Sequence, residues 1–198
     1  MPLKLLSPGG GSVLLQANTT GSDFTVNVPA VNGNMVTTAD TGSITQGMLG
    51  AGVYAGYGPA FSAYIGTTQS VTSATLTKVQ YDTEDFDTNN CYDTSNYRFT
   101  PNVAGYYQVN ATVYIATNAA GSQCIFDIYK TGSSYIRQRL FYTSGSSTLY
   151  AMPSISGLVY CNGTTDYIEM YCSVTATTPS FANTGLNSRF SAALLRSA

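Results

Sequence analysis

The sequence predicts an all-β fold. The clearest sign is a stretch near the middle of the chain in which apolar and polar residues alternate, because a period of two is typical of a half-buried strand. One face of this strand holds Tyr107, Val109, Ala111, Val113 and Ile115, and the other holds Tyr106, Gln108, Asn110, Thr112 and Tyr114. Tyr, Thr, Val and Ser are abundant and Gly-rich turns recur, whereas no stretch has a long apolar helical period.

Further strands are expected along the rest of the chain, separated by clusters of Gly, Asn, Ser and Pro. Pro101 and Gly105 cannot lie inside a central strand, so they mark the turn that precedes the alternating one. Many short strands at even spacing suit a two-sheet jelly roll. We expect strands at residues 60–65, 74–81, 96–100, 106–116, 123–130, 135–142, 148–159, 166–175 and 188–196.

Three motifs follow one another closely: Tyr92-Asp93, Arg98-Phe99-Thr100-Pro101 and Ala104-Gly105-Tyr106-Tyr107. This pattern resembles the signature of the complement component one-q globular head, a branch of the tumour-necrosis-factor-like jelly rolls. Three more stretches resemble the opening, penultimate and closing strands of that family, in the order it requires: Pro59–Ala63, Asp166–Met170 and Arg189–Leu195. The resemblance covers about residues 58–196 and implies that residues 58–198, which we call the head, form a jelly-roll β-sandwich.

The composition indicates that part of the surface is covered by other subunits. Only 9% of the residues are charged, against roughly 25% in a typical soluble domain, and aromatic residues reach 12%. A monomer with so few charges risks poor solubility. The resemblance implies that three heads pack through the outward face of one sheet. We therefore expect a trimer interface formed by Tyr106, Tyr114, Leu158, Tyr160, Tyr167 and Tyr171.

Two other interpretations of these aromatic residues stay open at the level of sequence. Several of them could lie beneath loops of the same chain, or a row of exposed tyrosines could bind glycans.

Residues 1–36 are expected to form an N-terminal β arm. Short strand-like pieces at 12–16 and 24–28 carry too little apolar mass for an independent core, so the arm needs a partner surface. The segments Lys4–Val13 and Phe24–Pro29 also resemble the opening of small structural proteins of tailed bacteriophages. We assign docking to the apolar residues Leu3, Leu5, Val13, Leu15, Phe24, Val26 and Val28.

Residues 37–57 are expected to form a Gly-rich linker between the arm and the head. A sharper alternative packs Ile44, Met48, Leu49 and Val53 around a threefold axis. Relatives of the complement head often carry a collagen stalk at this place, but no Gly-X-Y repeat occurs here, so a defence-collagen function is not expected.

The four cysteines are expected to be free thiols. Cys124 shares a strand face with Phe126 and Ile128, and Cys172 shares one with other apolar residues, so both are predicted to be small core residues. Cys161 and Cys172 are expected on the two arms of a hairpin that turns at residues 162–165, in a register that keeps them apart. No Cys-x-x-Cys pair and no histidine are present, which disfavours a zinc site.

The sequence offers little catalytic chemistry, so we predict that the chain is not an enzyme and binds no cofactor. It contains no histidine, nucleophile elbow, Walker loop or dinucleotide fingerprint. Five of its ten acidic residues lie in a predicted loop: Asp82, Glu84, Asp85, Asp87 and Asp93. Within this loop Asp85-x-Asp87-x-Asn89 begins like a calcium loop, but Asn90 stands at its sixth position and Asn96 at its twelfth. A solvated acidic loop is therefore favoured over a calcium site or a glycosidase carboxylate pair.

Charge and hydropathy narrow the class of partner. The net charge is −2 and the eight basic residues are scattered, so nucleic acid and anionic membranes are not expected partners. No apolar stretch approaches the roughly 18 residues of a membrane span. The first residues lack the apolar core of a secretory signal, so we expect a protein made in a cytoplasm that reaches its destination without conventional secretion.

These observations lead to one hypothesis and one rival. The hypothesis is a homotrimeric bacteriophage virion surface protein, assembled in the host cytoplasm and anchored to capsid or tail proteins by its N-terminal arm. Its jelly-roll head would either decorate or cement the capsid or serve as a short tail fibre, with loops such as 82–95 and 117–123 contacting a host glycan or receptor. The rival is a secreted lectin-like or cytokine-like binding module unrelated to a virion.

Overall fold

The computed structural model describes residues 3–6, 9, 12–15, 58–117, 123–141, 150–183 and 186–198, and every regular element among them is a β-strand. The chain forms two units, Met1–Ser43 and Ile44–Ala198. In the first unit, β1 (Leu3–Leu6) pairs antiparallel with β2 (Ser12–Leu15), which places Leu3 opposite Leu15 and Leu5 opposite Val13. The all-β prediction is confirmed. The predicted strand at 24–28 and the predicted linker lie outside the described residues.

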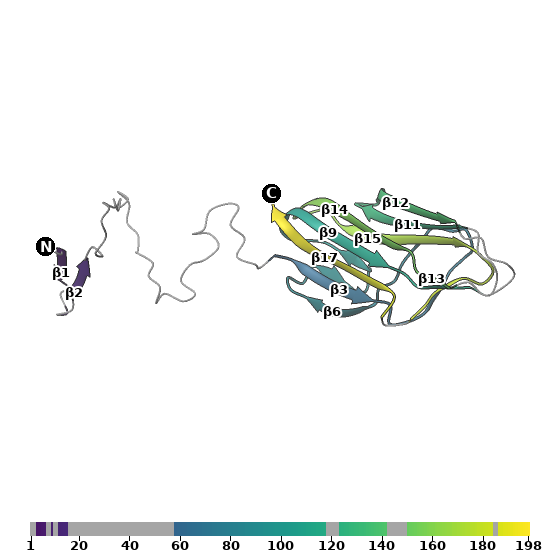
Figure 1. The fold of residues 1–198 in the computed structure, drawn as a ribbon, viewed down its shortest axis with the longest axis horizontal. Helices are drawn as coiled ribbons and strands as arrows, with labels where there is room; N and C mark the ends of the chain where they lie inside the picture. The colour runs from purple at the N-terminus through teal and green to yellow at the C-terminus, as the bar shows by residue number, and fades with distance from the viewer. Residues whose placement is uncertain are drawn as a thin grey trace, which may run out of the picture. The chain divides into compact units, whose positions relative to one another are not determined.

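The head contains two large antiparallel sheets (Figure 1). The five-stranded sheet has the order β6 (Thr83–Asp87), β3 (Ala60–Tyr64), β17 (Arg189–Ser197), β9 (Ala104–Thr112) and β14 (Ser154–Asn162). The six-stranded sheet has the order β12 (Ser133–Phe141), β11 (Gln123–Lys130), β15 (Ile168–Thr175), β8 (Arg98–Phe99) and β7 (Tyr92–Asp93), and β5 (Thr77–Lys78) also pairs with β15.

A third, small sheet lies at one end of the head. It has the order β13 (Tyr150–Ala151), β10 (Ile115–Ala116), β16 (Ser180–Phe181) and β4 (Gln69–Ser70). We call this end distal. At the opposite end, which we call proximal, the first described residues of the head meet the C-terminus. There the Leu194 N–H donates to the Pro59 carbonyl (3.0 Å) and the Ala198 N–H donates to the Ala104 carbonyl (3.1 Å).

An aromatic cluster between the two large sheets dominates the core. The ring of Phe61 on β3 stacks on Tyr92 of β7 and on Phe99 of β8, with ring centroids 4.5 and 4.6 Å apart. Phe190 on β17 meets the same Phe61 ring edge-on at 4.8 Å. Tyr92 also donates its hydroxyl to the Tyr81 carbonyl (2.8 Å), so this buried phenol is hydrogen-bonded. These contacts join strands from both sheets.

The signature motifs of the sequence serve this core. Tyr92, Phe99 and Tyr107 are buried in it, and Tyr107 donates its hydroxyl to the Val103 carbonyl (2.6 Å). Gly105 lies opposite a β-bulge in β17, where a Cβ would overlap the carbonyl oxygen of Arg196. A side chain at this position would push the two strands apart, which explains why glycine stands between Ala104 and the two tyrosines.

The predicted hairpin of Cys161 and Cys172 is wrong, because β14 and β15 lie in different sheets. The Asn162 side-chain oxygen accepts the N–H groups of Thr164, Thr165 and Asp166 at 2.9–3.0 Å, and Gly163 has a φ of +74°. This turn carries the chain across the sandwich rather than back along one sheet. The turn residues 162–165 predict a hairpin because a turn of this composition has the same local chemistry whether the next strand stays in the same sheet or enters the other one.

All four cysteines are buried free thiols, which confirms the prediction of core residues for Cys124 and Cys172. Burial raises the pKa of the Cys161 thiol to about 12. The sulfur atoms of Cys124 and Cys172 lie 3.7 Å apart on neighbouring strands.

The predicted acidic loop is only partly a loop, because β6 and β7 lie within it. β6 pairs with β3 alone and most of its side chains are exposed, so no apolar alternation marks it in the sequence. The predicted strand at 74–81 shortens to β5, since the chain there pairs with β15 at only two positions.

We expect the substitution Phe61→Ala to lower the free energy of unfolding by about 3–5 kcal/mol, because it empties the contact between the sheets. Urea denaturation followed by circular dichroism measures this loss. The matched control is Phe141→Ala, whose ring is 71% exposed, and its effect should stay within about 0.5 kcal/mol. Equal effects of the two substitutions would contradict this description of the core.

Candidate subunit interface

The outward face of the five-stranded sheet is the candidate site. Strand register arranges its side chains in rows across β14, β9 and β17. From the proximal to the distal end these rows are Tyr160, Tyr106 and Arg196; Leu158, Gln108 and Ala193; Ser156, Asn110 and Ser191; and Ser154, Thr112 and Arg189. The proximal rows are largely apolar and the distal rows are polar.

The proximal half exposes large apolar side chains. Tyr106 is 43% exposed, Tyr160 39% and Leu158 51%. The two tyrosine rings lie opposite each other in register, with centroids 5.4 Å apart. Adjacent exposed apolar side chains of this kind are typical of surfaces that contact another protein.

The polar half of the face, which begins at Gln108 and continues to the distal end, satisfies its own hydrogen bonds. Gln108 donates its amide to the Ser156 hydroxyl (2.7 Å), and Ser156 donates in turn to the Asn110 side-chain oxygen (2.9 Å). A shallow hollow of about 470 Å³ lies over this half, and Thr112, Leu186 and Arg189 contribute to its lining. Because the polar groups already bond one another across strands, covering them costs less than covering unpaired groups.

An ion pair lies at the β6 side of this face and was missed by sequence reasoning. The Arg189 guanidinium contacts the Asp85 carboxylate, which also accepts the Ser62 hydroxyl at 2.9 Å. Asp85 is the extra residue of a β-bulge, where the register between β3 and β6 shifts. Only the strand pairing brings it to Arg189, so no local pattern in the sequence could have revealed the pair.

The prediction that six residues share one face is wrong for Tyr167 and Tyr171. Tyr171 lies on β15 in the six-stranded sheet, where its ring packs on Tyr129 at 4.2 Å. Tyr167 precedes that strand, and the Arg98 guanidinium lies 3.7 Å from the centre of its ring. The error follows from the mistaken hairpin, which had placed β14 and β15 in one sheet.

Tyr114 is also displaced from the predicted face. The chain leaves β9 at Thr112 and enters the small sheet at Ile115, so Tyr114 lies between the two sheets. Its half-buried ring stacks on Tyr150 at 5.8 Å. The structure therefore brings together Tyr106, Leu158 and Tyr160 from the predicted set. Their role in a trimer stays a prediction.

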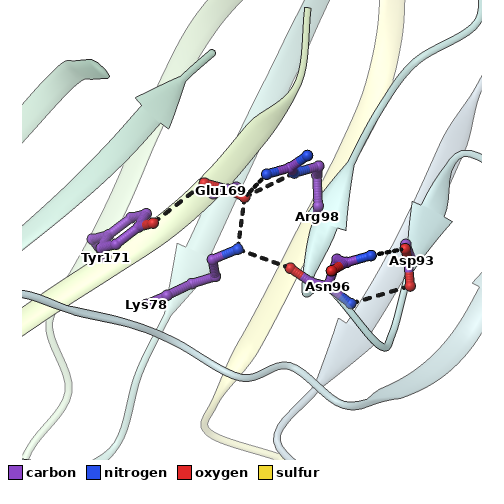
Figure 2. A network of polar contacts seen from close by, with 6 residues as sticks. All are labelled: Lys78, Asp93, Asn96, Arg98, Glu169 and Tyr171. Atoms are coloured by element: carbon purple, nitrogen blue, oxygen red, sulfur yellow. Dashed lines mark hydrogen bonds and ion pairs between the residues drawn. The ribbon is translucent and has the colours of Figure 1, made fainter. Parts of the chain in front are cut away.

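A network of polar side chains lies on the outer face of the six-stranded sheet (Figure 2). The buried Glu169 carboxylate pairs with Lys78 (2.7 Å) and with Arg98 (2.7 Å). The Lys78 ammonium also donates to the Asn96 carbonyl at 3.0 Å. Asn96 in turn donates its side-chain amide to Asp93 (2.6 Å), as the figure shows. That bond, with the N–H groups of Ser95 and Asn96, lowers the pKa of Asp93.

This network is an internal cross-link between strands. Glu169 is on β15, Arg98 on β8 and Lys78 on β5, so one carboxylate ties three strands and the turn after β7. A buried carboxylate needs such partners to remain charged. Both cations contact its Oε1 atom, and the Tyr171 hydroxyl donates to Oε2 (3.4 Å), so both carboxylate oxygens have partners within the head, which suits a structural role.

Three of the acidic residues in 82–93 each accept hydrogen bonds from a different part of the backbone. Asp82 accepts the Gly66 N–H (2.5 Å), Asp87 accepts the Tyr92 N–H (2.7 Å) and Asp93 caps its own turn. Within the described residues, no group of three or more His, Cys, Asp or Glu side chains is placed to hold a metal ion. The same part of the chain contains no helix long and apolar enough to cross a membrane.

No family model and no curated protein matches the sequence. Solved structures do match. The globular domain of the zebrafish complement 1qA protein superposes with a TM-score of 0.50 at 14% identity, over 71% of this chain and 99% of that one. Murine APRIL superposes with a TM-score of 0.51 at 11% identity, over 70% of this chain and 99% of that one.

The head is a jelly roll of the complement 1q and tumour-necrosis-factor type. This confirms the fold implied by the sequence motifs around Tyr92, Arg98 and Gly105. At identities this low the likeness concerns the fold, and the outward faces of the sheets must be judged on their own side chains.

We expect Glu169→Gln to lower the free energy of unfolding by about 1–3 kcal/mol, since both cations lose their charged partner. Thermal or urea unfolding measures the change. Thr72→Ala is the control, because the Thr72 side chain is exposed, and it should change stability by no more than about 0.5 kcal/mol. A neutral effect of Glu169→Gln would mean that the network does not stabilise the sheet.

Proposed function

We propose that this protein is a homotrimeric binding module of a bacteriophage virion surface, with no catalytic role and no cofactor. The observation that carries the trimer is the proximal half of the five-stranded sheet. There the side chains of Tyr106 on β9 and of Leu158 and Tyr160 on the edge strand β14 lie beside one another and are 39–51% exposed. The composition, with 9% charged residues, supports a covered surface.

The rest of the same face is compatible with being covered. The Gln108, Asn110 and Ser156 side chains bond one another, and Arg189 is paired with Asp85. An interface typically has an apolar centre with polar groups that are either bonded or solvated. The resemblance of the chain to complement-type heads, which pack in threes through this kind of sheet, favours three copies.

The proposed virion role rests on the N-terminal arm. The pairing of β1 with β2 makes a two-stranded hairpin of four residues on each side, which is marginal in water without a partner. The arm sequence resembles the opening of small structural proteins of tailed bacteriophages. We therefore assign the arm to docking on a capsid or tail protein, and the head to projection from the particle, where it would contact a host glycan or receptor.

The double substitution Tyr106→Glu and Tyr160→Glu should convert the trimer to monomers, because it places two charges per copy in the proposed contact. Sedimentation velocity of the full chain measures the mass. Tyr150→Glu is the matched control, since that ring is 64% exposed in the small sheet, and it should leave the trimer intact. If the double variant stays trimeric, the proposed face is not the interface.

Deletion of residues 1–36 should leave a folded head that no longer associates with particles, because the proposed docking surface is gone. Co-sedimentation of the full and shortened chains with particles lacking the native protein measures this. A shortened chain that still binds would remove the docking role from the arm.

Imaging with an antibody against the head then distinguishes the two virion sites. Label over an icosahedral shell supports capsid decoration, and label on the tail supports a host-recognition fibre. Protein found only free of particles would favour a secreted lectin-like or cytokine-like module.

A further inference from the structure

The two long sides of the head carry charges of opposite sign. On one side β12 and β14, the edges of the two large sheets, pack together where Ile136 lies over Gly157. On the other side β6 and β7 meet where the Tyr92 N–H bonds Asp87. Figure 1 shows β12 and β6 on opposite sides of the sandwich. We define the basic edge as Arg137 and Arg139 of β12, and the acidic edge as Glu84, Asp85 and Asp87 of β6.

Most of these charges are engaged within the head, but two are not. Arg137 forms a two-pronged contact with the buried Asp127 (2.6 and 2.9 Å), and Asp85 pairs with Arg189. The side chains of Arg139 and Glu84 are exposed, and among the described residues neither side chain has a hydrogen-bond or ion-pair partner. Burial and the nearby Asp87 carboxylate raise the pKa of Glu84, so a cation placed there would relieve repulsion.

The two unengaged charges lie at nearly the same level along the strands. Gly157 lies next to Ile136, and residues paired across neighbouring strands lie at the same level of a sheet. Starting from Gly157, this pairing leads through Val109, Ala192 and Phe61 to Asp87 on the acidic edge. Arg139 lies three residues beyond Ile136 in the distal direction. Glu84 pairs with Ala63, two residues beyond Phe61 in the same direction. The difference is about one residue, or roughly 3.3 Å, which an arginine side chain easily spans.

Apolar side chains accompany both edges. Leu158 and Tyr160 are exposed on β14 beside the basic edge, and Phe86 is 51% exposed on β6 at the acidic edge. Each side of the head therefore offers an apolar contact next to an unengaged charge. The two sides match each other in polarity and in level.

We propose that the copies associate through unlike edges, so that the basic edge of one copy contacts the acidic edge of the next. Arg139 of each copy then lies opposite the Glu84 of its neighbour. Charges on opposite sides of one molecule cannot meet within it. They meet at every contact of a closed ring, where each copy uses both edges once. This inference rests on the proposed trimer and specifies which surfaces of the copies join.

The salt dependence of assembly is the first test. Sedimentation equilibrium of the full chain gives the concentration at which trimers half-dissociate. This concentration should rise when NaCl is increased from about 0.05 to about 0.5 M, because salt screens the pairing of the edges. A purely apolar contact would strengthen or stay unchanged in the same range, which would overturn the inference.

Charge reversal is the decisive test. Arg139→Glu or Glu84→Arg alone should raise the half-dissociation concentration at least about tenfold, because like charges then face each other at each contact. The double variant restores opposite charges and the native net charge, and should return toward the native value. Far-ultraviolet circular dichroism should match the native protein in all three variants, since both side chains are exposed and the head still folds.

The outcomes separate this inference from the proposed function. A native trimer that neither single reversal weakens, or that the double reversal fails to restore, overturns the edge pairing and leaves the trimer standing. A native dimer overturns both the edge pairing and the proposed trimer, because a twofold contact joins the same surface of each copy. A native monomer overturns the proposed trimer itself.

Discussion

Phe61 lies between Tyr92 and Phe99, and these ring contacts hold the two large sheets together. The strands that supply them are short, since β7 and β8 have two residues each, so backbone pairing alone cannot fix their position. Stacked and edge-on rings add to the free energy gained by burying them. The Glu169 network lies on the outer side of the same corner, because Arg98, which pairs with Glu169, directly precedes Phe99 on β8. Inner rings and outer charges thus fix one corner of the sandwich.

This constraint explains what the sequence signature encodes. Tyr92 and Phe99 fill the core, Arg98 neutralises Glu169 and Gly105 allows β9 and β17 to approach. All these residues maintain the jelly roll. A chain can therefore share the fold of complement 1qA and APRIL at 11–14% identity while the outward faces of its sheets differ freely. In this chain the outward face of the five-stranded sheet carries tyrosine and serine side chains, and the two edges of the head carry opposite charges.

The sequence was sufficient where residues repeat with a clear period. The alternation from Tyr106 onward identified β9 and its inward face, and the cysteines on apolar faces were found in the core. It was insufficient where long-range pairing decides. Asn162 and Gly163 form a turn whose local chemistry does not reveal whether the next strand stays in the same sheet. For this reason Tyr171 was assigned to the wrong face, and the Arg189–Asp85 pair across a bulge was not foreseen.

In the proposed trimer, other copies of the chain cover the outward face of the five-stranded sheet. An experimental structure of the intact chain in solution, obtained by cryo-electron microscopy or from crystals checked against the solution mass, tests it most directly. We expect three copies around one axis, with Tyr106, Leu158 and Tyr160 buried between them. An assembly in which these side chains face water, or in which the copies join through the outward faces of the six-stranded sheets, would contradict this arrangement.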